Sequence, residues 1–308
     1  MKNYYQDTKY ISNSHLQAFK RCPFFYAEKY INGNVQEIER DYFIYGQIVD
    51  TLLTEPEKFN QKFLPVDRRI DISALKETKT DLAELDKEIS VKQLEKKPHK
   101  SLQDKKEKLM EAIKKMEEAG EKEQITKALY ENALESINEI SRQELYKMFR
   151  VEDMSQEIIT LEACGDMPAR KGKLDYINVK KKIIADIKTC ASFKMFRPQN
   201  YYQQLSYYRE LASIKYGISE EDWDCYLLVV SKEAEMKHSQ MYHISKNLLD
   251  IAKQENHELI ERFMESQKSG FYTPCTENNT PARQEVCFDC PHYSACPFSQ
   301  QKEFVYLQ

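Results

Sequence analysis

Residues 172–190 read GKLDYINVKKKIIADIKTC, and this stretch decides the fold class. Its apolar positions predict two short strands, over Lys173–Val179 and Ile183–Lys188, and the lysine-rich turn between them suggests that they pair as a hairpin. Asp186 and Lys188 are two positions apart, so their side chains leave the second strand on the same face.

Asp175, on the first of these strands, can face Asp186 and Lys188 across the hairpin. Two carboxylates without a counter-charge repel each other, and this favours binding of a divalent cation such as Mg²⁺ or Mn²⁺. A neighbouring lysine can then orient a water molecule or stabilise negative charge on a phosphate. An isolated Asp-x-Lys pattern is often only a salt bridge at a strand edge. The surrounding sequence is therefore needed to distinguish a salt bridge from a metal-binding site.

Strands and helices alternate on both sides of this hairpin. Ile158–Ala163 predicts a preceding strand, and a helix rich in Tyr and Gln is expected over about Pro198–Tyr216. Cys225–Ser231 and Lys237–Ile244 then predict neighbouring strands, and Leu248–Ser266 an amphipathic helix. This order indicates an α/β core with a mixed central sheet flanked by helices.

The N-terminal third is expected to be helical. Ser12 or Ser14 can cap a first helix, which Pro23 kinks, and a second helix is predicted from about Asp41 to Thr54.

The segment 66–124 is highly charged and carries only narrow apolar seams. It predicts an antiparallel helical hairpin inserted into a single domain that spans 1–308, with Ser101 and Asp104 resembling a capping box at the start of its second helix. Two roles are open for this hairpin: a structural spacer, or a basic arm that guides DNA or binds a partner.

Composition excludes several function classes. The chain has 308 residues, 41% hydrophobic and 31% charged, with a net charge of −4 and only 7 glycines. No phosphate-binding P-loop and no Gly-x-Gly-x-x-Gly string occurs, which argues against an ATP-driven motor or a Rossmann enzyme. No apolar run approaches 18 residues and no signal-peptide core is present, so we expect a soluble cytoplasmic protein that does not contact a membrane.

Three of the eight cysteines, Cys287, Cys290 and Cys296, lie within ten residues. Disulfides are rare in the cytosol, so this spacing predicts part of a thiolate metal or cluster site whose fourth ligand lies elsewhere. Cys275 is close enough in sequence to be a ligand. A zinc ribbon would normally show two Cys-x-x-Cys pairs, and this favours iron–sulfur over zinc.

The ordered strings GKLD at 172–175, DIKT at 186–189 and QLSYY at 204–208 resemble the defining motifs of the PD-(D/E)xK nuclease superfamily, in its RecB-type exonuclease branch. The resemblance implies a restriction-endonuclease-like core.

By the same resemblance, Asp175 and Asp186 would bind the metal and Lys188 would be the catalytic lysine. Gln204 and Tyr208 would contact the DNA strand or position active-site groups, and Gln203 with Tyr207 is the alternative register for that pair.

Two further carboxylates have a place in this resemblance. GQIVD at 46–50 resembles the family's G-x-x-x-H helix, whose histidine is an additional metal ligand; this chain has Asp50 there, which is a harder ligand than imidazole. Glu162 matches a recurrent acidic position of phage and RecE-like members, where a second-metal carboxylate and a structural carboxylate are both open.

Residues 12–23, which end in Cys22-Pro23, resemble the N-terminal cluster motif of iron–sulfur RecB-type nucleases. The resemblance implies a [4Fe-4S] cluster held by Cys22, Cys287, Cys290 and Cys296, with Cys275 as the rival ligand and zinc as the rival metal.

Together these resemblances imply a metal-dependent DNA exonuclease that acts on ends or single strands in phage or mobile-element recombination or replication. Because the chain lacks an ATPase motif, a helicase or annealing protein is a natural partner. The alternatives are a CRISPR-adaptation-type nuclease that trims prespacer ends, a catalytically inactive DNA-binding or scaffold protein with the same fold, and a regulator that senses iron or redox state through the cluster.

Overall fold

The structure is a computed structural model that describes residues 4, 7–35, 41–95, 98–142, 146, 154–232 and 239–272. These residues divide into two compact units, which are described one at a time. The first takes its residues from 1–41, 143–231 and 239–308, and the second from 42–142 and 232–238.

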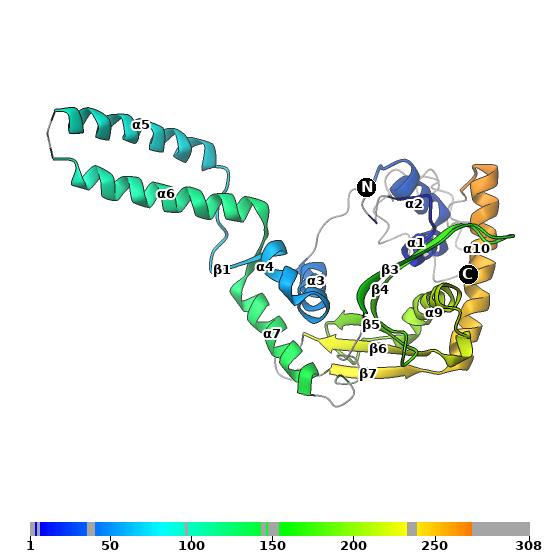
Figure 1. Cartoon of the computed structure of the whole chain (residues 1–308). Coiled ribbons are helices and arrows are strands. Elements are labelled where there is room, and N and C mark those ends of the chain that lie inside the picture. Colours follow the sequence, from blue (N-terminus) through cyan, green and yellow to red (C-terminus); the bar gives the residue numbers. More distant parts are fainter. Residues whose placement is uncertain are drawn as a thin grey trace, which may run out of the picture. The chain divides into compact units, whose positions relative to one another are not determined.

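A five-stranded sheet forms the centre of the first unit, in the order β3-β4-β5-β6-β7 (Figure 1). Its strands are β3 (Met154–Leu161), β4 (Arg170–Asn178), β5 (Ile183–Cys190), β6 (Asp224–Ser231) and β7 (Ser239–Ile244). Only β5 and β6 are parallel, and the other neighbours are antiparallel. The mixed sheet and all five strands expected from the sequence are confirmed, with ends that shift by a few residues.

Strands β4 and β5 pair over only three register positions, from Tyr176 opposite Ala185 to Asn178 opposite Ile183. Beyond these pairs the strands diverge, and the first part of β4 bonds to the N-terminal segment instead. Ile11 donates to Ala169 O at 2.8 Å and accepts from Lys171 N at 2.8 Å. The hairpin predicted from the sequence is therefore present, with one end opened.

In chain order, helix α9 (Tyr202–Tyr216) follows the 3₁₀ turn η4 (Pro198–Tyr201) in the connection from β5 to β6, and it packs against β3, β4 and β5. Almost its whole middle is buried, including the charged Arg209 and Glu210. Gly172 on β4 lets the helix approach closely, because a Cβ there would lie 2.7 Å from Leu211 Cδ1 and 3.1 Å from the Tyr208 ring.

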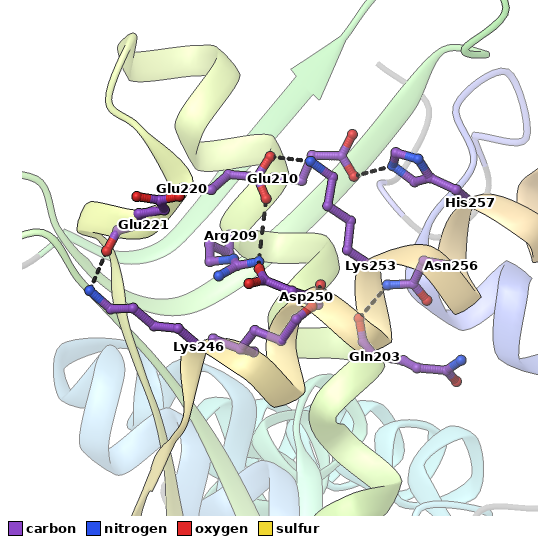
Figure 2. Close-up of polar contacts among 12 residues, drawn as sticks. Gln203, Arg209, Glu210, Glu220, Glu221, Lys246, Asp250, Lys253, Asn256 and His257 are labelled. Carbon is purple, nitrogen blue, oxygen red and sulfur yellow. Dashed lines mark hydrogen bonds and ion pairs between the residues drawn. The ribbon is translucent and has the colours of Figure 1, made fainter.

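Helix α10 (Lys246–Ser269) covers α9 through polar contacts, shown in Figure 2 together with the short turn η5 (Glu220–Asp222). The fully buried Arg209 pairs with Asp250 at 2.5 Å, and Asn256 donates to Gln203 O at 2.8 Å. On the sheet side, Glu210 pairs with Arg170 at 2.7 Å. Helix α9 is thus held from both sides, and its orientation is fixed.

The N-terminal helices pack against α10. They are α1 (Asn13–Arg21), α2 (Pro23–Tyr26) and the π-helix η2 (Ala27–Ile31). Ser12 caps α1 as predicted, and the break falls at Cys22, before Pro23.

An aromatic cluster joins these helices to the C-terminal side of the described chain. Phe19 and Tyr26 contact the Phe263 ring of α10 at centroid distances of 5.2 and 5.0 Å, and Tyr26 contacts Tyr272 at 5.8 Å. The two ends of the described chain therefore meet in this cluster.

The second unit is mainly helical. Its elements are α3 (Asp41–Thr54), η3 (Pro56–Lys58), α4 (Phe59–Lys62), β1 (Phe63–Val66), α5 (Leu75–Leu94), α6 (Lys100–Glu121), β2 (Glu123–Thr126) and α7 (Lys127–Arg142). Helix α3 has the bounds expected from the sequence. The short parallel pair of β1 with β2, and α7, were not expected.

Helices α5 and α6 form the predicted antiparallel hairpin (Figure 1). Ion pairs join the two helices, between Lys79 and Glu117 and between Lys106 and Asp86, each at 2.7 Å. The expected capping box was wrong: the N-cap is His99, two residues before Ser101, and it makes no side-chain cap bond.

Within the described part of the chain, no helix combines the length and the apolar character that crossing a membrane requires.

Candidate active site

Strand β5 presents Asp186 and Lys188 on one face. The Asp186 side chain is buried, with only 1% of the residue exposed. Its Oδ2 atom forms an ion pair with Lys188 Nζ but accepts no hydrogen bond of normal geometry from the described residues. Among the described residues, the charged partner of this buried oxygen is therefore the Lys188 ammonium group.

Asp175 stands where β4 and β5 diverge. Its Oδ2 accepts a hydrogen bond from the Ile187 backbone N–H at 2.8 Å, in a stretch where β4 no longer pairs with β5. The side chain thus takes the place of a strand partner and holds the carboxylate beside the Asp186–Lys188 pair.

The two carboxylates set the charge of the lysine. Burial lowers the pKa of Lys188, but the negative charges of Asp186 and Asp175 outweigh burial and hold this pKa above its ordinary value. Lys188 is therefore an ammonium group at neutral pH. In this state it can donate hydrogen bonds and stabilise negative charge, whereas it cannot accept a proton.

Helix α9 contributes Gln204 and Tyr208. Gln204 Nε2 donates to Asp186 Oδ1 at 3.2 Å and to the Tyr208 hydroxyl at 2.9 Å. Burial raises the pKa of Tyr208 well above its usual range, with the nearby Asp186 and Asp175 adding to the effect, so its hydroxyl stays neutral.

Gln203 and Tyr207, the alternative register, are directed elsewhere. Gln203 Oε1 accepts from Lys20 Nζ at 2.9 Å, and the Tyr207 hydroxyl donates to Ile11 O at 2.6 Å. The structure therefore brings the Gln204–Tyr208 pair to Asp186.

An aromatic side chain that sequence reasoning missed also borders the site. Lys188 Nζ lies 5.3 Å from the centre of the Tyr201 ring, within the range of a cation–π contact. Phe196 extends this small group, because its ring stacks 5.4 Å from that of Tyr201. The only signal in the sequence is the concentration of aromatic residues between the DIKT and QLSYY strings.

The donor set fits a divalent cation. Asp175 and Asp186 offer carboxylate oxygens, which Mg²⁺ and Mn²⁺ prefer, and a cation at Asp186 Oδ2 would share this oxygen with the Lys188 ammonium group. In the described ranges, no group of three or more His, Cys, Asp or Glu residues comes together as a metal site. Water and substrate oxygens, and Asp50 as predicted from the sequence, are candidates for the remaining ligand positions.

Asp50 lies on α3, in the second unit, and its role as a metal ligand stays a prediction. Glu162 is exposed just beyond the end of β3, where it contacts the Tyr10 hydroxyl and pairs with Lys9 at 3.2 Å. The adjoining Leu161 pairs with Arg170, five residues before Asp175 on β4. The contacts of Glu162 with Tyr10 and Lys9 fit the role of a structural carboxylate, and we leave Glu162 out of the proposed metal ligands.

Cys22 is buried and has a free thiol between α1 and α2. Cys275, Cys287, Cys290 and Cys296 lie outside the described residues, so the cluster stays a prediction.

The fold and the candidate site together define the class of protein to which the chain belongs. A mixed sheet that carries Asp175, Asp186 and Lys188 on a hairpin, backed by Gln204 and Tyr208 from the crossover helix, is the arrangement of the PD-(D/E)xK nuclease superfamily. The profile of a family described as a PDDEXK-like domain of unknown function (DUF3799) matches residues 12–279, and the chain belongs to this family.

Solved structures support the fold. A protein titled "Putative exonuclease" from Eubacterium rectale is 19% identical, with a TM-score of 0.57 over 92% of this chain and 91% of that chain. A protein named SSO0001 is 17% identical over 56% of this chain and 73% of that chain, with a TM-score of 0.31, from which we draw nothing. Among the curated proteins compared with the chain, none matches.

Proposed function

We propose that this protein is a divalent-metal-dependent DNA exonuclease. The observation that carries the proposal is the buried Asp186 carboxylate, which lies beside Asp175 and Lys188 and is supported by Gln204. Membership of a PDDEXK-like family supports hydrolysis of phosphodiester bonds. The resemblance to RecB-type enzymes and the name of the Eubacterium rectale protein support the exonuclease mode.

Asp175 and Asp186 would hold one or two Mg²⁺ or Mn²⁺ ions. Such an ion neutralises charge on the phosphate and makes a bound water more acidic. Gln204 restrains Asp186 through its bond to Oδ1, while Oδ2 pairs with Lys188. Tyr208 restrains the Gln204 amide in turn, so the carboxylate is pre-organised by two residues of α9.

Lys188 would act as a fixed positive charge. Because its pKa is held above the ordinary value, it can donate to a phosphate oxygen and stabilise the negative charge that develops there as water attacks. The Tyr201 ring lies against the ammonium group on one side and limits its rotamers.

The decisive experiment is degradation of an end-labelled oligonucleotide by the purified protein, with and without Mg²⁺ or Mn²⁺. We expect metal-dependent cleavage, and a loss on the order of 10²-fold or more in Asp186→Asn and in Lys188→Ala. Matched labels at the 5′ and 3′ ends would give the polarity, and a circular strand would separate exonuclease from endonuclease activity. Cleavage at the unchanged rate in Lys188→Ala would reject the assignment.

The proposed setting is processing of DNA ends or single strands in phage or mobile-element recombination or replication. No ATPase string is present in the sequence, so a helicase or an annealing protein would have to provide single-stranded substrate.

A [4Fe-4S] cluster on Cys22, Cys287, Cys290 and Cys296 is the second part of the proposal. Two observations support it: the Cys22 thiol is buried and free, and Tyr272, fifteen residues before Cys287, packs against Tyr26 four residues after Cys22. The last described residue, Tyr272, thus lies close to the helix that follows Cys22.

A further inference from the structure

The loop Ala191–Arg197 connects the two halves of the candidate site, and we call it the rim loop. It leaves β5, which carries Asp186 and Lys188, and leads through η4 into α9. Phe196 anchors it, stacking 5.4 Å from Tyr201 and lying 5.9 Å from Tyr242 of β7. Because Tyr201 also lies against Lys188, the rim loop borders the site in space as well as in sequence.

The rim loop has a built shape. Met195 N donates to Ser192 O at 3.1 Å, and Phe196 N donates to Phe193 O at 3.2 Å. The Arg197 guanidinium donates through Nη1 to the backbone carbonyls of Lys194 and Phe196, at 2.9 and 3.1 Å. These bonds close successive turns, so the outward-facing side chains are held in a defined arrangement.

Those outward-facing side chains are the unusual feature. Met195 is 75% exposed, although its neighbour Phe196 is buried. Lys194 and Arg197, on either side, are also exposed. In the part of the chain that the structure describes, neither forms an ion pair with an acidic residue, whereas lysines such as Lys182 and Lys253 in the same unit do.

We propose that the rim loop is the entry site for a single DNA strand. Lys194 and Arg197 would neutralise backbone phosphates, and Met195, a polarizable apolar side chain, would lie against a base. Two such cations around an exposed apolar tip are complementary to a strand that alternates phosphates and bases. The inference rests on the proposed function, because it specifies where the DNA substrate would enter the same site.

The test is binding of a fluorescent single-stranded oligonucleotide across a series of salt concentrations. All variants are made in an Asp186→Ala background without added metal, so that cleavage does not interfere. The double variant Lys194→Gln/Arg197→Gln is expected to weaken binding roughly tenfold at low salt. Its salt slope should also fall by about 1.4, which corresponds to two phosphate contacts on a single strand.

The matched control is Arg262→Gln/Lys268→Gln, which removes the same two charges from exposed α10 residues that form no ion pair with a described residue. It is expected to bind like the parent. Met195→Ser should weaken binding about threefold and leave the salt slope unchanged, whereas Ile214→Ser, at another exposed apolar position, on α9, should have no effect.

Equal losses in the rim-loop and α10 double variants would overturn the inference, and so would an unchanged salt slope in the rim-loop variant. Failure here is distinct from failure of the proposed function. A wild-type protein that cleaves with metal, together with rim-loop variants that bind the oligonucleotide like their Asp186→Ala parent, would keep the nuclease proposal and reject the rim loop as the entry site.

Discussion

Lys188 would have two effects at the scale of the single residue, because the charge proposed to stabilise the reacting phosphate also pairs with Asp186, a proposed metal ligand. In the structure its ammonium group is the counter-ion of Asp186, and a divalent cation must bind against this positive charge. The lysine is therefore expected to lower the affinity of the candidate site for a metal ion.

Lys188→Met should consequently be inactive yet bind Mn²⁺ roughly tenfold more tightly, because one repelling charge is removed. Calorimetric titration with Mn²⁺ measures this directly. Lys182→Met, in the turn of the same hairpin and paired with Asp222, is the control and should keep the wild-type affinity. Weaker Mn²⁺ binding in Lys188→Met would show that the lysine does not oppose the metal.

Asp50 gives a related prediction. If its carboxylate ligates the metal, Asp50→Ala should shift the Mn²⁺ dependence of cleavage to higher concentration, and Asp50→His should preserve activity. An unchanged Mn²⁺ titration in Asp50→Ala would assign the residue a purely structural role in α3.

His15 links stability to pH. Burial lowers its pKa to about 4, with the charges of Lys171 and Lys29 adding to the shift, whereas the unfolded chain has the ordinary value near 6.5. Between these two pKa values the unfolded state binds more protons than the folded state. The free energy of unfolding should therefore not be reduced by His15 above pH 6.5. It should then fall by up to roughly 3 kcal/mol as the pH drops to 4.

His15→Gln should flatten this pH dependence. His15 Nδ1 accepts from the Ser12 N–H at 3.4 Å, and a glutamine can make the same reciprocal bond of a capping box. Chemical denaturation of both proteins at pH 7, 5.5 and 4 gives the comparison. Parallel stability curves for the two proteins would mean that His15 titrates normally in the folded state.

The spacing of residues predicted the acidic pair and the lysine, because two-residue alternation along β5 places Asp186 and Lys188 together. Spacing could not predict the partner of Asp175, whose carboxylate bonds a backbone N–H only because β4 and β5 diverge. The contact of Tyr201 with Lys188 was equally out of reach, since it depends on the reversal of the chain in the rim loop.

At the scale of elements, packing of α9 on β4 explains the glycine of the GKLD string. Gly172→Ala should lower the free energy of unfolding by about 1–3 kcal/mol, because the new methyl group overlaps Leu211 and the Tyr208 ring, both of which are buried. It should also reduce cleavage, since Tyr208 is displaced from Gln204. Thermal and denaturant unfolding, with an oligonucleotide assay, test both effects.

Gly120→Ala is the control for this substitution. Gly120 lies inside α6, and a methyl group added there would meet no atom within 4 Å beyond the backbone of its own helix, so alanine should stabilise the helix by up to about 1 kcal/mol. A Gly172→Ala protein as stable as wild type would show that α9 can move away without cost.

Elements with strong periodicity were predictable, and short ones were not. The hairpin of α5 and α6 follows from apolar seams that repeat over many turns, whereas β1 and β2 have four residues each and no alternation of their own. Their parallel pairing is a tertiary contact between segments on either side of the hairpin, which local pattern does not record.

At the scale of the whole molecule, the prediction concerns the proposed cluster. A link between Cys22 and the cysteines near residue 290 would close a very long loop, and such a link restricts the unfolded chain strongly. Cys22→Ser should therefore lose iron, colour and stability together, and lose nuclease activity only as a consequence. Iron and sulfide analysis of anaerobically prepared protein, together with absorbance near 400 nm, measures the loss of the cluster.

Cys164→Ser is the control, because Cys164 is exposed and lies outside the proposed ligand set. Full iron content in Cys22→Ser would transfer the fourth ligand to another residue, with Cys275 the first to test. Stoichiometric zinc without iron would make the site a zinc site and would leave the nuclease proposal unaffected.

The covering of α9 by α10 has a consequence for the timing of synthesis. A ribosome has already translated every motif of the candidate site once it passes residue 208, but the helix that pairs with Arg209 and accepts from Ser206 comes only at 246–269. Domains assemble as units while the chain emerges. A growing chain thus carries the proposed catalytic groups for some sixty residues of translation before α9 is locked in place, so the candidate site would become competent only after α10 has been synthesised.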